Sequence, residues 1–197
     1  RMALMIGAER QQNFLKSLGF FETTALQMPE AQLADPLLPK HWSEIVTMTV
    51  SYGHGLSASP MHLAAAYATI AGGGTKVSPT LVQRDGYAPG ERVISEDTSR
   101  IMRDFLRQVV VRGTASFGEV PGYGVGGKTG TADKPDPRGG YYDDKVIATF
   151  ASIFPAKDPK YVLVVTLDEP EETSGEEPRR TAGWTAVPVA AEIIRRA

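Results

Sequence analysis

The fold of this chain is indicated most clearly by one segment, Val125-Gly126-Gly127-Lys128-Thr129-Gly130-Thr131-Ala132. Two segments rich in Val, Ile, Phe and Thr follow it, and we predict that it is itself a strand. Side chains alternate along a strand, so Thr129 and Thr131 project one way while Lys128, Gly130 and Ala132 project the other. Two hydroxyls and a cation are therefore expected along one short edge of a sheet.

This combination suits an extended ligand that ends in a carboxylate. The two hydroxyls can donate to the carboxylate oxygens, and a hydrogen bond to a charged group contributes roughly 1.5–3 kcal/mol. Gly130 leaves room for a ligand lying along the strand, whose edge can pair with a peptide backbone. The backbone N–H near Thr131 is a candidate donor to a developing oxyanion. The alternative interpretation, an ordinary strand end with a glycine bulge, would be preferred for a bare Lys-Thr-Gly, but the glycine-rich approach and the two following strands favour a site.

Composition excludes several functional classes. The 197 residues are 42% hydrophobic, and we predict one domain over residues 1–197 with no internal boundary. A formal net charge of -2 without a Lys/Arg cluster argues against a nucleic-acid partner. No run approaches the ~20 apolar residues of a membrane-spanning helix, and there is no cysteine. The three histidines lack metal-ligand spacing and are interpreted as surface or turn residues, so neither a metal nor a cofactor is expected.

The order of the remaining elements predicts an α+β fold, an antiparallel sheet flanked by helices. Apolar periodicity and capping signals predict helices over residues 2–18, from Ser59-Pro60 to the glycines at 72–74, from Ser95 to Arg112, and near the C-terminus with Pro188 early in it. Strands are predicted at residues 123–132, 145–154 and 161–168, the last two forming an antiparallel hairpin. Residues 20–42 are interpreted as a long surface connection, and residues 80–94 as a short hairpin turning at 88–90.

The sequence around these elements resembles the class B penicillin-binding proteins, and among them the septal, cell-division transpeptidases of Gram-negative bacteria. Lys-Thr-Gly is one of three motifs that build the acyl-transfer site of penicillin-binding proteins and serine β-lactamases. Further matches cover nearly the whole chain: residues 52–60 running into 63–68, Gly113-Thr114-Ala115, residues 120–123, Asp168-Glu169-Pro170 and residues 186–189. The other two motifs, Ser-x-x-Lys and Ser-x-Asn, do not occur in these 197 residues.

The resemblance implies a β-lactamase/transpeptidase-like fold and a serine D,D-transpeptidase that cross-links peptidoglycan stem peptides ending in D-Ala-D-Ala and binds β-lactam antibiotics. Lys128 would be catalytic, through a hydrogen bond to the serine of Ser-x-Asn and the proton relay. Thr129 and Thr131 would bind the substrate carboxylate, and the Thr131 amide would form half of the oxyanion hole. Gly130 and Ala132 complete the substrate-binding strand.

Because two motifs are missing, the chain is expected to be the C-terminal portion of the transpeptidase domain. The nucleophile would then lie on an upstream part of the same protein, and the isolated chain would be inactive. The resemblance further implies a protein at the periplasmic face of the bacterial inner membrane, anchored by an upstream segment, with divisome proteins as partners.

Two other functions stay open on the sequence. One is a non-catalytic sensor or interaction module that keeps the β-lactam-binding strand. The other, within enzymes, is a D,D-carboxypeptidase or β-lactamase, which the segment around Gly53 disfavours. The loop from Asp133 to Asp144 is interpreted either as a wall of the substrate groove, through Tyr141 or Tyr142, or as a mobile hairpin connection.

Overall fold

The computed structural model describes residues 1–24, 26–30, 35–83, 85–86 and 90–197. Its contacts divide the chain into two compact units, residues 1–95 and residues 96–197. Each unit is described below by itself.

The first unit opens with two short helices rather than with the single predicted helix over residues 2–18. Helix α1 covers Met2–Ile6 and helix α2 covers Ala8–Ser17. Gly7 separates them with a φ of 83°, a left-handed conformation that interrupts an α-helix and that glycine adopts without steric cost. The prediction of one helix was therefore wrong, although the predicted stop at Gly19, where φ is 90°, is confirmed.

Helix α3, Glu44–Val50, was not predicted. Its β-branched residues favour strands over helices, so the local pattern gave no helical signal. The helix is instead started by Ser43, whose side chain accepts a hydrogen bond from the Val46 amide at 3.3 Å. Gln11 then ties α2 to this region, since its Nε2 donates to the Thr47 carbonyl and its Oε1 accepts from the Trp42 indole, both at 3.0 Å.

Helix α4, Pro60–Ala71, begins and ends where the sequence predicts, between Ser59 and Gly72. The prediction that all three histidines are surface or turn residues is wrong for His62, which lies in the first turn of α4 and is 3% exposed. Its Nδ1 lies 2.7 Å from the Ser59 hydroxyl and accepts from the Ser59 amide at 3.3 Å, which completes a capping box. The other ring nitrogen, Nε2, lies 2.7 Å from the Glu22 carbonyl.

The predicted connection and hairpin of the first unit are only partly described. Residues 25 and 31–34 of the connection, and 84 and 87–89 of the hairpin with most of its turn, lie outside the described residues. Thr75 and Arg92 form a single antiparallel bridge. Thr75 lies outside the predicted range, and the described residues of 80–94 contain no strand, so the predicted hairpin is not found among them.

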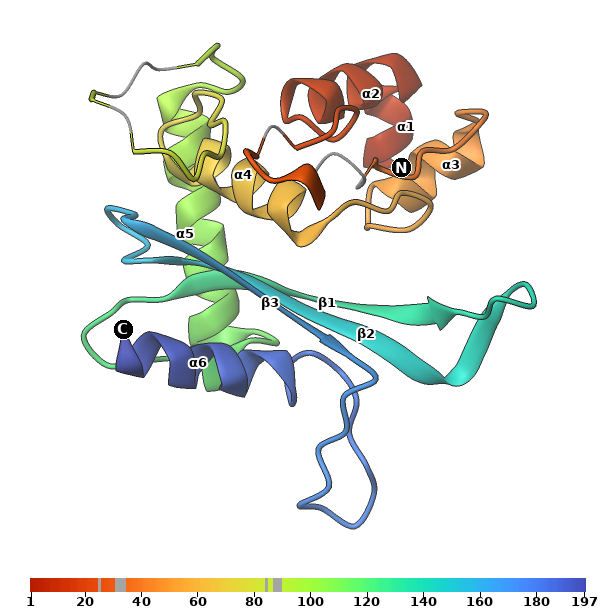
Figure 1. The fold of residues 1–197 in the computed structure, drawn as a ribbon, viewed down its shortest axis with the longest axis vertical. Coiled ribbons are helices and arrows are strands. Elements are labelled where there is room, and N and C mark those ends of the chain that lie inside the picture. Colours follow the sequence, from red (N-terminus) through yellow and green to blue (C-terminus); the bar gives the residue numbers. More distant parts are fainter. Residues whose placement is uncertain (25, 31–34, 84, 87–89) are drawn as a thin grey trace. The chain divides into compact units, whose positions relative to one another are not determined.

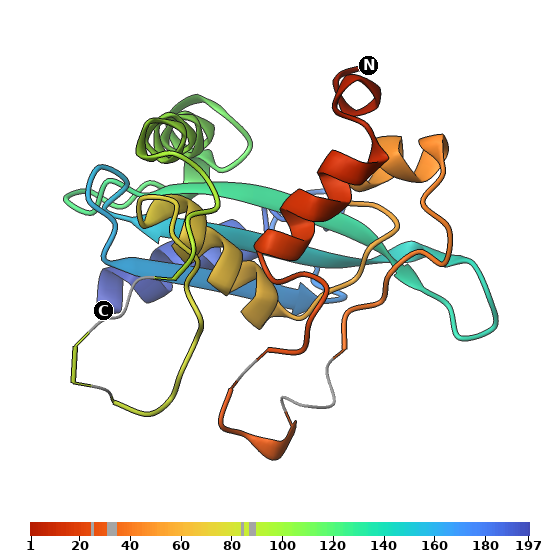
Figure 2. The same ribbon diagram turned by 90° about the horizontal axis from the view of Figure 1, so that it is seen from above.

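The second unit is built on a three-stranded antiparallel sheet in the order β1-β2-β3 (Figure 1). Strand β1 is Gly126–Pro135, β2 is Tyr141–Phe154 and β3 is Tyr161–Asp168. The antiparallel pairing of both neighbours is confirmed, as is the α+β class. Strand β1 begins and ends three residues later than predicted, and the β1–β2 hairpin extends beyond the end of β3 (Figure 2).

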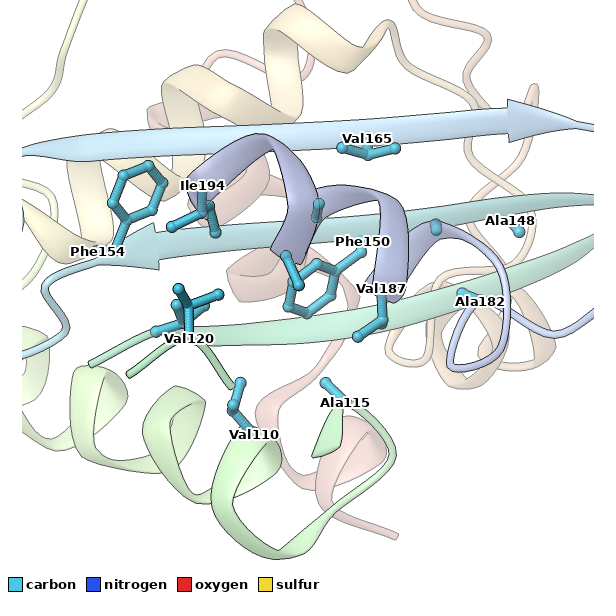
Figure 3. Packing of buried hydrophobic residues seen from close by; sticks show 14 residues of the cluster. Val110, Ala115, Val120, Ala148, Phe150, Phe154, Val165, Ala182, Val187 and Ile194 are labelled. Atoms are coloured by element: carbon cyan, nitrogen blue, oxygen red, sulfur yellow. The ribbon is translucent and has the colours of Figure 1, made fainter. Parts of the chain in front are cut away.

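Helices α5, Glu96–Arg112, and α6, Ala186–Arg196, both confirm predicted helices and flank the sheet. Helix α5 contacts β1, while α6 contacts β2 and β3. A short 3-10 helix, η2, covers Ser116–Gly118 between α5 and β1. The hydrophobic core lies between the sheet and α6 (Figure 3), with Phe150 of β2 fully buried among Val187 and Ile194 of α6.

Arg107 of α5 fixes the approach to β1. Its guanidinium is paired with the carboxylate of Glu119, and its Nη1 donates to the Val125 carbonyl at 2.7 Å. An arginine fork that holds a carboxylate and a main-chain carbonyl together restricts both segments. Residue 125 is the last residue before β1, so the strand enters the sheet at a defined position.

Candidate active site

The register of the sheet sorts the residues of Lys128-Thr129-Gly130-Thr131-Ala132 onto two faces. Thr129 pairs with Phe150 and Thr131 with Ala148, both members of the core between the sheet and α6. Lys128, Gly130 and Ala132 pair with Ala151, Thr149 and Ile147 and therefore lie on the opposite face. The predicted alternation is thus present in the structure.

Strand β1 also forms an edge of the sheet. It pairs with β2 on one side, and its other side has no strand partner among the described residues. A Cβ built on Gly130 would meet only the Thr149 carbonyl, 4.0 Å away. This part of the strand is therefore open to a ligand, as the sequence predicts.

A pocket of about 420 Å³ adjoins Thr129 and Thr131, and every residue that lines it belongs to the second unit. Three segments meet there: the turn after α5, strand β1, and the segment before α6. The lining residues are Gly113, Thr114, Ser116, Phe117, Thr129, Thr131, Thr181, Ala182, Gly183 and Trp184. A pocket of this size is large enough for a small organic group.

Both site threonines are hydrogen-bonded by residues of the neighbouring segments. The Thr129 hydroxyl lies 2.7 Å from the Thr114 hydroxyl, and the Thr131 hydroxyl accepts from the backbone N–H of Ala182 at 3.0 Å. The segments that carry Thr114 and Ala182 pack closely against each other, since a Cβ built on Gly183 would lie 2.7 Å from the Thr114 carbonyl oxygen. The pocket thus depends on a glycine at position 183.

Lys128 lies at the exposed side of the strand. Its Nζ donates to the Thr129 carbonyl at 2.7 Å and lies 3.5 Å from the Thr129 hydroxyl. The ammonium and the hydroxyl of Thr129 therefore lie within hydrogen-bonding reach of each other, although their side chains start on opposite faces of β1.

Two aromatic side chains, Phe117 and Trp184, line the pocket. The rings of Phe117 and Trp184 lie 5.0 Å apart, and the Arg179 guanidinium lies over the Trp184 ring at 4.0 Å. Arg179 is held in turn by Glu172, at 3.8 Å. Sequence reasoning did not assign Phe117, Trp184 or Ala182 to the site; the Gly113-Thr114-Ala115 match was the one signal that pointed to this region.

The far end of the β1–β2 hairpin does not line the pocket, and ion pairs hold it against the end of β3. Lys134 donates to Asp168 at 2.8 Å and to Glu169 at 2.7 Å, and Lys145 also pairs with Glu169. Hydrogen bonds from Lys134 first and from Lys145 second lower the pKa of the Glu169 carboxyl. Tyr142 packs under the Lys145 ammonium, and neither Tyr141 nor Tyr142 is a lining residue of the pocket.

The described part of the chain contains no group of three or more His, Cys, Asp or Glu side chains able to hold a metal ion. Within the same residues, no helix combines the length and apolar character needed to cross a bilayer.

Comparison with solved structures defines the class of protein. The chain superposes on the apo transpeptidase domain of penicillin-binding protein 3 from Burkholderia pseudomallei with a TM-score of 0.85 and 36% identity, covering 98% of this chain and 57% of that one. It also superposes, with a TM-score of 0.83 and 30% identity, on penicillin-binding protein 3 from Mycobacterium tuberculosis complexed with ampicillin, covering 98% of this chain and 46% of that one. The fold is thus that of a penicillin-binding protein transpeptidase domain.

Sequence comparison then gives the family. The family model described as the penicillin binding protein transpeptidase domain matches residues 1–195. The chain is 34% identical to the probable peptidoglycan D,D-transpeptidase FtsI of Caulobacter vibrioides, over 99% of this chain and 34% of the relative. It is 35% identical to the penicillin-binding protein PbpB of Mycolicibacterium smegmatis, over 99% and 33%.

The chain therefore belongs to the penicillin-binding protein transpeptidase domain family, in its class B, FtsI/PBP3-type branch. It spans about a third of the length of these curated relatives.

Proposed function

We propose that this chain is the carboxylate-binding part of a serine D,D-transpeptidase that cross-links peptidoglycan stem peptides during septal cell-wall synthesis. The observation that carries the proposal is the pair of hydroxyls, Thr129 and Thr131, that face one pocket on an open strand edge. Membership of the penicillin-binding protein family supplies the reaction class.

Each site residue has a role in this proposal. The Thr129 and Thr131 hydroxyls donate to the C-terminal carboxylate of the stem peptide, and the Thr131 amide is one donor to the oxyanion. Gly130 and Ala132 let the peptide lie along β1, and Lys128 supplies positive charge and takes part in the proton relay. The exposed position of Gly130 and the reach of Lys128 to Thr129 support these assignments.

The chemistry proceeds through a serine carried by the upstream part of the same protein. The serine oxygen attacks the carbonyl of the penultimate D-Ala, the peptide bond breaks, and the terminal D-Ala leaves as the free amino acid. An amine of a second stem peptide then attacks the ester, which forms the cross-link and restores the serine. β-Lactams would acylate the same serine, as the ampicillin complex of the relative from M. tuberculosis suggests.

The place and partners of the whole protein form part of the same proposal. A peptidoglycan transpeptidase works on the outer side of the cytoplasmic membrane, so we place the protein at the periplasmic face, with an upstream anchor. Divisome proteins would be its partners. Fractionation of cells that carry a tagged full-length protein tests this location; a tag found only in the cytosolic fraction would contradict it.

The test of the reaction uses the full-length protein. Incubation with ampicillin should give one covalent adduct by intact-mass spectrometry, and a synthetic stem peptide with an amine acceptor should yield free D-Ala together with a cross-linked dimer. Release of D-Ala without a dimer would indicate a carboxypeptidase, and rapid turnover of ampicillin a β-lactamase. The complete absence of an adduct would favour a non-catalytic module.

A further inference from the structure

We propose that Thr114 is a positioning residue, which orients the Thr129 hydroxyl so that it donates into the pocket. Thr114 would donate a hydrogen bond to the Thr129 hydroxyl, as the backbone N–H of Ala182 does to the Thr131 hydroxyl. The inference rests on the proposed function, because it concerns how the same carboxylate site is prepared for its anionic ligand. Its basis is the direction in which each hydrogen bond must run.

The direction at Thr131 is fixed by its partner. A backbone N–H can only donate, so the Thr131 oxygen must accept the bond from Ala182 at 3.0 Å. Ala182 is completely buried, and its N–H therefore depends on this acceptor. The hydroxyl proton of Thr131 is thereby left to be donated to something else, and Thr131 lines the pocket.

The direction at Thr129 depends on Thr114. The two hydroxyl oxygens are 2.7 Å apart, so one of them donates to the other. An ammonium can only donate, so the Thr129 hydroxyl oxygen can only accept from the Lys128 Nζ, which lies 3.5 Å away. If Thr114 also donates, the proton of Thr129 is free for a carboxylate, and the bonds run Thr114 to Thr129 to ligand. Hydrogen bonds in such a chain strengthen one another.

Thr114 is well placed to act in this way because its own position is restrained. It is the second residue after α5, and the next residue is tied back to the helix by a hydrogen bond from the Ala115 amide to the Val109 carbonyl at 3.3 Å. Its carbonyl is packed against Gly183, which is next to Ala182 in sequence. The two groups that orient the site threonines are therefore held together on one side of the pocket, apart from β1.

The ligand that fits two outward-donating hydroxyls is a small anion, here the carboxylate of a peptide C-terminus or of a β-lactam. The carboxylate needs donors only, since an ionised carboxyl group accepts hydrogen bonds and offers none. Charge-assisted bonds are about twice as strong as neutral ones, so the direction of the threonine protons has a measurable effect on binding.

The test measures acylation of the full-length protein by ampicillin, separated into the initial binding constant and the maximum acylation rate. Thr114→Val removes the hydroxyl while keeping the shape, and we expect it to weaken initial binding about tenfold with little change in the maximum rate. Thr114→Ser keeps the hydroxyl and should bind as wild type. Thr129→Val should weaken binding by about tenfold or more, and Thr114→Val should have no further effect in that background.

Thr166→Val serves as the matched control. The Thr166 hydroxyl pairs with that of Thr149 at 3.1 Å, so this variant breaks a threonine pair between β2 and β3 that does not line the pocket. It should bind ampicillin as wild type does. Thermal melting of all variants, and Thr114→Ala as a second truncation, separate a loss of binding from a loss of folded protein.

The outcomes distinguish the inference from the function on which it rests. Normal binding by Thr114→Val and Thr114→Ala beside weak binding by Thr129→Val would overturn the inference alone, as would additive effects in the double variant. Normal binding by Thr129→Val would overturn both the inference and the carboxylate role of that residue. A wild-type protein that ampicillin does not acylate would overturn the proposed function itself.

Discussion

At the scale of single residues, the Thr131 hydroxyl has one role in the proposed ligand binding and one in folding. It is a candidate donor to the carboxylate, and it is also the acceptor for the buried N–H of Ala182. A buried donor left without a partner costs about 1–3 kcal/mol. Substitution of this residue therefore affects folding as well as ligand binding.

Thr131→Val should lower the free energy of unfolding by about 1–3 kcal/mol and also slow acylation by ampicillin. Chemical denaturation measures the first effect and stopped-flow acylation the second. Thr131→Ser, which keeps the hydroxyl, is the control and should be close to wild type in both. Unchanged stability of Thr131→Val would mean that the Ala182 N–H finds another acceptor.

Gly183 and Gly130 should respond in opposite ways to an added methyl group. Gly183→Ala places a Cβ 2.7 Å from the Thr114 carbonyl, and the overpacking should cost about 1–3 kcal/mol of stability. Gly130→Ala meets only an atom 4.0 Å away and should fold normally, yet it should slow acylation because the new methyl group stands beside the open edge of β1 along which the proposed peptide lies. Melting temperatures and acylation rates of the two variants check this contrast; equal melting temperatures would contradict it.

At the scale of elements, strands and long helices were predictable, while the shorter helices were not. Strand β3 and helix α5 carry regular apolar patterns and lie where those patterns indicate, and β2 ends as predicted but begins four residues earlier, at Tyr141 rather than at residue 145. The N-terminal pattern continues through Gly7, whose backbone conformation divides it, and the β-branched residues of α3 hide its helical state. These two failures have local causes.

The partners of the site threonines could not be predicted for a different reason. Ala182 lies 51 residues from Thr131 in sequence, and Thr114 lies 15 residues from Thr129. Local periodicity contains no information on which loops meet across a sheet. The strand with its two hydroxyls was therefore predictable from the sequence, but the groups that orient these hydroxyls were not.

The ionic contacts at the end of the β1–β2 hairpin should respond to acid. The pKa of Glu169 is lowered in the folded protein, so its contribution to stability is complete above the unfolded value of about 4.3 and is lost as the pH falls through the folded pKa. The pKa values of Lys134 and Lys145 are raised, so their contribution is lost only at alkaline pH.

Amide hydrogen exchange at the hairpin should therefore stay constant from neutral pH down to about 4.5, after correction for the intrinsic rate, and accelerate below it. Glu169→Gln should exchange faster at neutral pH and show a weaker acid response. A wild-type hairpin whose protection is unchanged at pH 3 would show that these ion pairs do not hold it.

At the scale of the whole molecule, the chain contains one site strand but neither Ser-x-x-Lys nor Ser-x-Asn. Groups that act together in catalysis lose most of their effect when one is missing. We expect the isolated 197 residues to form no stable adduct with penicillin by intact-mass spectrometry, while the full-length protein does. Circular dichroism must first show that the isolated chain is folded, and a stoichiometric adduct on any of its serines would contradict the expectation.

The location of the pocket entirely within residues 96–197 has a consequence for inhibitors. If the groups that bind the anion are carried by one compact unit and the attacking oxygen by another part of the protein, a compound can occupy the first without ever reacting with the second. A small carboxylic acid with an aromatic group placed against Phe117 and Trp184 would compete reversibly with β-lactams. Because it carries no strained ring, such a compound would also escape the enzymes that destroy these drugs.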